Sequence, residues 1–101
     1  MMRIKEMEQC LDQATEALAQ TEAALNAFKA AQPAIVMLEA YLGSDDWRKD
    51  LAADERGLLP PNLKRGVLSE DGIWNLLERN RELLQQMQVL ATQGLKDTPE
   101  P

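Results

Sequence analysis

The first third of the chain carries apolar side chains at alternating steps of three and four residues, and neither glycine nor proline interrupts them before Pro33. This spacing puts the side chains on one face of an α-helix, and its persistence over four heptads predicts one long helix over residues 3–31. Such a helix would be about 43 Å long at the rise of an α-helix. The apolar seam consists of Ile4, Met7, Leu11, Ala14, Leu18, Thr21, Leu25 and Phe28.

The middle of the chain predicts two short helices separated by helix-breaking residues. Pro33 is expected to end the first helix and to open a second over residues 33–42, which Gly43 terminates. Ser44 is a typical N-cap residue, so a third helix is predicted to begin there and to end at Gly57.

The segment that follows, residues 58–68, contains two prolines and a glycine, which forbid a regular helix. It is nevertheless too apolar for a free linker, so we expect it to pack across the other helices. Its apolar side chains are Leu58, Leu59, Leu63, Val67 and Leu68.

Ser69 is expected to cap a last helix, which ends at Gly94. This helix has a second apolar seam, formed by Ile73, Leu76, Asn80, Leu83, Met87 and Leu90. Asn80 lies within that seam, where it either fixes the register of a helix pair or faces a polar edge. The remaining residues, 94–101, are predicted to form a disordered tail.

These elements predict a single all-α domain over residues 1–93. The long N-terminal and C-terminal helices are expected to lie antiparallel in a small bundle, with two short helices and the packed proline-rich connector between them. A length of 101 residues suits one domain, and an aromatic content of only 4% suits helices better than sheets.

Charge and composition argue against several classes of function. The net charge is −6, whereas nucleic-acid-binding proteins usually present a basic face. The chain has no histidine and only one cysteine, Cys10, which excludes most zinc, copper and iron sites and any internal disulfide. No segment approaches the roughly 20 apolar residues of a membrane span. We therefore expect a cytoplasmic protein without a cofactor.

A row of carboxylates in the third predicted helix is the strongest candidate for a metal site. Asp46, Asp50 and Asp54 recur every four residues and so share one helical face. With Glu70 or Asp71 they would offer the oxygen ligands of Mg²⁺ or Mn²⁺, in a small cation-dependent enzyme or ligand-binding protein. Parallel side chains on one helix seldom converge on one ion, so a helix cap and a solvated face are favoured, with no metal bound.

Two cations, Lys64 and Arg65, form the most basic spot and precede the last helix. They would suit an anion at the helix N-terminus, but the acidic residues there compete with such a ligand. The favoured interpretation is that one of them pairs with Asp50 or Asp54 and ties the connector to the third helix.

Several sequence motifs resemble those of a known family. They are "YLGSDDWRKDL", "LLPPNLKRGVLSEDGIWNLL" and "NRELL", preceded by the opening helix "RIKEMEQCLDQATEAL". On these motifs the chain resembles the family catalogued as domain of unknown function 4298. The resemblance implies a small, all-helical, mostly bacterial protein, and it transfers no catalytic or binding residue.

The function that the pattern favours is that of a non-enzymatic helical module that associates with itself or with another protein. A homodimer through the first helix would cover its seam, and Ala17 and Ala24 beside the seam would permit close approach. Tryptophan also anchors interfaces, although Trp47 and Trp74 at helical spacing are more often core residues. The candidate contact residues are Ile4, Met7, Leu11, Leu18 and Trp74. No small-molecule substrate is indicated.

Overall fold

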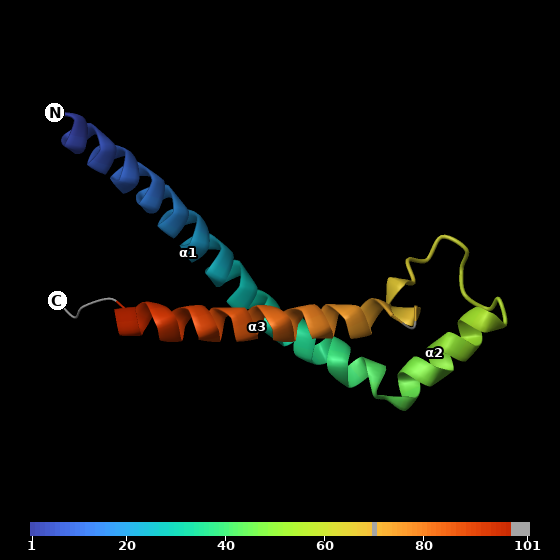
Figure 1. The fold of residues 1–101 in the computed structure, drawn as a ribbon. Helices are drawn as coiled ribbons and strands as arrows, with labels where there is room; N and C mark the ends of the chain where they lie inside the picture. The colour runs from blue at the N-terminus through green and yellow to red at the C-terminus, as the bar shows by residue number, and fades with distance from the viewer. Residues whose placement is uncertain (70, 98–101) are drawn as a thin grey trace. The chain divides into compact units, whose positions relative to one another are not determined.

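The structure is a computed structural model that describes residues 1–69 and 71–97. It has three α-helices and one short 3₁₀-helix, and these residues contain no strand (Figure 1). The elements are α1 (Met2–Leu42), α2 (Asp45–Glu55), η1 (Gly66–Leu68) and α3 (Gly72–Asp97). The predicted all-α fold is confirmed.

The chain divides into two compact units, residues 1–35 and residues 36–101. The first unit is the greater part of α1. The second contains the end of α1 and the other three helical elements. The antiparallel arrangement of the two long helices stays a prediction.

The first helix is longer than predicted, because Pro33 does not end it. The helix continues through Pro33 to Leu42, so the two helices expected on either side of this proline are one. Proline has no N–H to donate to the carbonyl of Lys29, four residues earlier. Alanines precede and follow Pro33, at positions 31 and 34, and their high helix propensity favours continuation.

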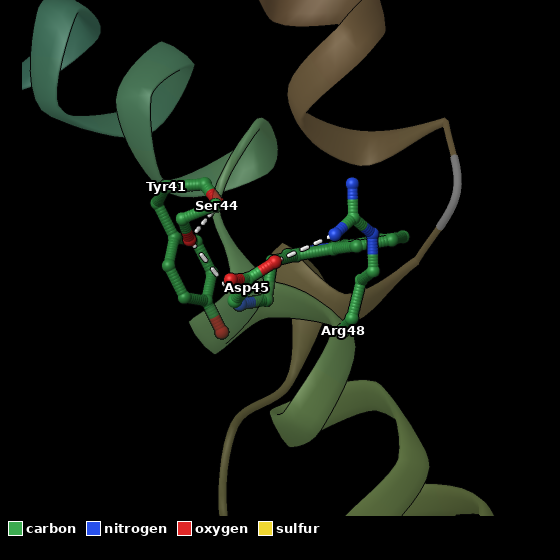
Figure 2. Close-up of polar contacts among 5 residues, drawn as sticks. Tyr41, Ser44, Asp45 and Arg48 are labelled. Atoms are coloured by element: carbon green, nitrogen blue, oxygen red, sulfur yellow. Dashed lines mark hydrogen bonds and ion pairs between the residues drawn. The ribbon is translucent and has the colours of Figure 1, made fainter.

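The junction between α1 and α2 is closed by Ser44, as Figure 2 shows. Its backbone N–H and its hydroxyl both donate to the carbonyl of Tyr41, at 3.0 and 2.6 Å. The same hydroxyl accepts from the N–H of Trp47 at 3.3 Å, which confirms the predicted N-cap. Asp45 in the first turn pairs with Arg48 at 2.7 Å. Gly43 follows the last residue of α1 without the positive φ of a left-handed cap.

The other end of α2 has the glycine cap that the sequence predicts. Gly57 has φ +70°, a conformation that residues with a Cβ rarely adopt. Its N–H donates to the carbonyl of Asp54, and the N–H of Leu58 donates to that of Ala53, each at 3.0 Å. This pair of bonds is a Schellman motif, which satisfies the last carbonyls of the helix.

The connector after α2 is packed only in part, which corrects the expectation that its five apolar side chains are sheltered. Leu68 is buried and Leu59 half-buried, but Leu58, Leu63 and Val67 are exposed. Two polar contacts hold the segment instead of a continuous apolar layer. The indole N–H of Trp47 donates to the carbonyl of Val67 at 2.9 Å, and Arg65 pairs with Asp54.

The start of α3 is a tight junction with η1. The hydroxyl of Ser69 accepts from the N–H of Gly72 at 2.9 Å, as predicted for a capping residue. A Cβ built on Gly72 would lie 2.6 Å from the carbonyl oxygen of Gly66, so only glycine fits there. The helix passes through Gly94 and reaches Asp97, so its predicted end is three residues too early. The rest of the predicted tail, 98–101, lies outside the described residues.

Replacing Ser69 by alanine should lower the free energy of unfolding by about 1 kcal/mol, because the N–H of Gly72 loses its acceptor. The urea midpoint checks this, and Ser69→Asp is the matched control because it keeps an acceptor oxygen. An equal midpoint for Ser69→Ala and the wild type would show that another group caps α3.

The described core is very small. Only Leu68 and Ile73 are buried among residues 1–69 and 71–96. The second unit also has half-buried large apolar side chains, at Leu38, Leu42, Trp47, Leu51, Leu59 and Leu77. Most large apolar side chains of the chain therefore face solvent.

Candidate functional site: the apolar face of the first helix

The predicted heptad seam on α1 is exposed along most of its length. Five of its large side chains keep 44–70% of their surface accessible, Phe28 is half-buried, and none of the residues of α1 is buried. The exposed fractions are 64% for Ile4, 56% for Met7, 59% for Leu11, 70% for Leu18 and 44% for Leu25. Because the five lie on one face of a continuous helix, they form a single apolar stripe, which we call the α1 stripe.

The two flanks of the α1 stripe differ in chemistry. One flank carries small side chains every seven residues, at Cys10, Ala17, Ala24 and Ala31, and all four are exposed. The other flank carries Glu8, Thr15, Glu22 and Lys29, which are also exposed. A helix that approached the first flank would meet little bulk, whereas one at the second would meet charge.

Thr21 is the polar residue of the seam, between Leu18 and Leu25, and its hydroxyl is not an unsatisfied hydrogen-bond donor. The hydroxyl of Thr21 donates to the carbonyl of Ala17, one turn earlier, at 2.8 Å. A buried hydroxyl without a partner would be costly, but this one has its partner inside its own helix. Thr21 can therefore enter an apolar contact at little cost.

The C-terminal helix also presents apolar side chains to solvent. Trp74, which the sequence places more readily in a core, is 54% exposed, so it does not belong to the described core. Asn80 is half-buried, whereas Leu83, Met87 and Leu90 along the same seam are exposed. A shallow groove of about 390 Å³ opens beside the start of α3, lined by Leu38, Lys64, Gly66, Val67, Ile73 and Leu76.

Two of the three carboxylates in the predicted row on α2, Asp50 and Asp54, are engaged in structural contacts on two different segments. Asp50 accepts a 2.7 Å hydrogen bond from the hydroxyl of Tyr41, and Asp54 pairs with Arg65. Asp46 and Asp71 are exposed, and Glu70 lies outside the described residues. Within the described ranges, no three acidic or cysteine side chains lie close enough to hold a metal ion.

Arg65 holds the connector to α2, as the favoured interpretation of the basic spot predicts. Its guanidinium contacts the carboxylate of Asp54 and donates to the carbonyls of Pro60 and Leu63, at 2.6 and 3.2 Å. A guanidinium with three such partners within the protein is not available to bind an external anion. Lys64 is exposed at the rim of the groove, so the two cations do not form a joint anion site.

Two further contacts of this region were not expected from the sequence. Tyr41 reaches Asp50 across the turn at Ser44, and Trp47 reaches Val67 over 20 residues. The contact between Tyr41 and Asp50 could have been inferred from the sequence. A tight turn between two helices brings the last turn of one helix close to the first turns of the next. The second depends on the path of the connector, for which the sequence has no signal.

The hydrogen bond to Asp50 and the negative charges nearby raise the pKa of Tyr41 to about 12. The neutral phenol is favoured in the folded protein, so its contribution to stability is present below pH 10 and is lost as the pH rises through 12. Tyr41 is the single tyrosine, so phenolate absorbance reports it alone. Asp50→Asn should move the pKa back toward 10, whereas Asp45→Asn, which removes a charge outside this contact, should change it little.

For the row of carboxylates we expect calorimetry to find no stoichiometric, sub-millimolar binding of Mg²⁺, Mn²⁺ or Ca²⁺. The physical reason is that Asp50 and Asp54 already have partners in the protein, on two different segments. A binding isotherm that Asp50→Asn abolishes would contradict this expectation and support a cation-dependent protein.

Among the described residues, none of the helices contains an apolar stretch long enough to cross a lipid bilayer. No curated protein and no solved structure matches the chain. One protein family does match, over residues 4–90, which cover α1, α2 and most of α3. The chain belongs to this family, described as Domain of unknown function (DUF4298).

Proposed function

We propose that the protein is a non-enzymatic helical interaction module that forms a homodimer through the α1 stripe. The observation that carries the proposal is the exposure of five large apolar side chains in a continuous heptad seam. Contiguous apolar surface of this kind is typical of an interaction site in a soluble protein. Trp74 on α3 is a second candidate contact, since tryptophan is enriched among interface residues that dominate binding.

The energetics suit a dimer of micromolar affinity. Two copies would bury two sets of five side chains, and each contributes roughly 1.5 kcal/mol. The sum, about 15 kcal/mol, exceeds the roughly 8 kcal/mol of a micromolar dissociation constant. The difference of about 7 kcal/mol falls within the cost of association in lost translational and rotational freedom.

A second copy is the simplest partner for this surface. A symmetric dimer closes on itself and leaves no complementary face unpaired, which makes it the commonest assembly of soluble proteins. Heptads with small residues on one flank and charges on the other also suit helix-to-helix pairing. A reducing compartment such as the cytoplasm suits a chain whose one cysteine is exposed.

Sedimentation equilibrium over a range of concentrations tests the proposal. The chain has a mass of 11.3 kDa, so the dimer corresponds to twice this value. We expect the average mass to rise toward the dimer at micromolar concentration and to decrease on dilution. A monomer at every concentration would overturn self-association.

A further inference from the structure

The flanks of the α1 stripe contain enough information to determine how two copies would pair. We propose that the helices pair antiparallel in one register, with Glu8 of each copy opposite Lys29 of the other and Cys10 opposite Ala31. This inference rests on the proposed homodimer and specifies its geometry.

Antiparallel pairing follows from the separation of the two flanks. In an antiparallel pair each flank faces its own counterpart, so the small residues at 10, 17, 24 and 31 meet one another. In a parallel pair each small residue would instead face a residue of the other flank, and Glu22 and Lys29 would face alanines. Only the antiparallel arrangement gives both close backbone approach on one side and charge pairing on the other.

Charge then selects the register. When Glu8 lies opposite Lys29, two symmetry-related ion pairs form and Thr15 lies opposite Glu22. A shift of one heptad in one direction places Glu8 against Glu22, and a shift in the other places Glu22 against its own copy. Like charges directly opposite each other are unfavourable, so both shifted registers are disfavoured.

The same register gives compatible layers inside the interface. At its centre Ala14 faces Leu25 and Leu18 faces Thr21, so each of these two layers joins a large side chain with a smaller one. The outer layers pair Leu11 with Phe28, Met7 with Gln32 and Ile4 with Ile35. The pairing extends from Ile4 of one copy to Ile35 of the other. That range fills the first compact unit, residues 1–35.

The single cysteine makes the register testable by disulfide formation. A disulfide needs Cα atoms within about 7 Å, which is less than the roughly 10 Å that one heptad spans along a helix. In the Ala31→Cys variant, Cys10 of one copy should form a disulfide with position 31 of the other. The two cysteines of one chain are about 31 Å apart along the same helix and cannot react with each other.

The Ala24→Cys variant is the matched control. In the proposed register the new cysteine at position 24 of one copy lies one heptad away from Cys10 of the other copy. It should therefore form no disulfide. In either shifted register the opposite holds: Ala24→Cys forms a disulfide, with Cys10 or with its own copy, and Ala31→Cys does not. Wild-type Cys10 residues would lie about 31 Å apart in the antiparallel dimer. In a parallel dimer they would lie on opposite sides of the interface, so none of the three proteins would form a disulfide there.

The experiment is mild air oxidation of the wild type and both variants, followed by non-reducing electrophoresis, with sedimentation equilibrium of each protein under reducing conditions. We expect a linked dimer for Ala31→Cys alone. Links in Ala24→Cys or in the wild type, or no link in any of the three proteins, with a dimer by sedimentation, would overturn the register and leave the homodimer. Monomers under reducing conditions in all three would overturn the proposed function itself.

A charge exchange gives a second readout that does not need oxidation. Glu8→Lys should weaken the dimer on the order of tenfold, because both ion pairs become repulsive. Adding Lys29→Glu should restore the affinity, since the pairs are then reversed but complementary. Failure of the second substitution to restore affinity, while the wild type dimerises, would overturn the register.

Discussion

Replacing Met7 and Leu11 by glutamate is expected to abolish the dimer. Both positions lie in the α1 stripe, so the double variant would bury four unpaired carboxylates per dimer. At about 1 kcal/mol or more each, the loss is on the order of 1,000-fold in affinity. Sedimentation equilibrium measures it directly.

The matched control for this variant is Gln9→Glu with Gln13→Glu. These residues are also exposed on α1, but they lie on the side of the helix away from the stripe. The control adds the same charge, and glutamate is a good helix former in both cases. A dimer that survives Met7→Glu with Leu11→Glu would place the interface elsewhere on the chain.

Replacing Pro33 by alanine should stabilise α1 by about 3 kcal/mol. The substitution restores an N–H toward the carbonyl of Lys29 and removes the proline ring from the helix interior. Amide hydrogen exchange should show greater protection around residues 29–37. Pro61→Ala, outside the helices, is the control and should leave this region unchanged. Unchanged protection in Pro33→Ala would indicate that the helix ends and restarts at Pro33.

Local signals of the sequence were the most reliable part of the prediction. Ser44 and Ser69 cap helices and Gly57 terminates one, because each effect depends on a few neighbouring backbone groups. The prediction was wrong where one residue of low helix propensity stands among residues that favour a helix. Pro33 and Gly94 were expected to end helices, but both lie inside helices that continue past them. A single unfavourable residue does not end a helix whose flanking residues favour it.

Contacts between segments that are distant in sequence were predictable only where a charged side chain had few residues of opposite charge to pair with. Arg65 has few acidic residues within reach, so its pair with Asp54 was among those expected. The bond from Trp47 to Val67 depends on the path of a proline-rich connector, which local propensities do not determine. The seam of α1 was evident from its spacing, but spacing alone does not say what covers it, since its partner lies outside the helix.

Methionine oxidation tests most directly whether a second copy covers the α1 stripe. Met7 lies in the stripe with 56% of its surface exposed, whereas Met37, 73% exposed, lies in the second compact unit, outside the stripe. Both can be followed by mass spectrometry after a brief pulse of hydroxyl radicals. As protein concentration rises through the micromolar range, Met7 should become protected while Met37 reacts as before. Equal reactivity of Met7 at all concentrations would contradict the proposed dimer.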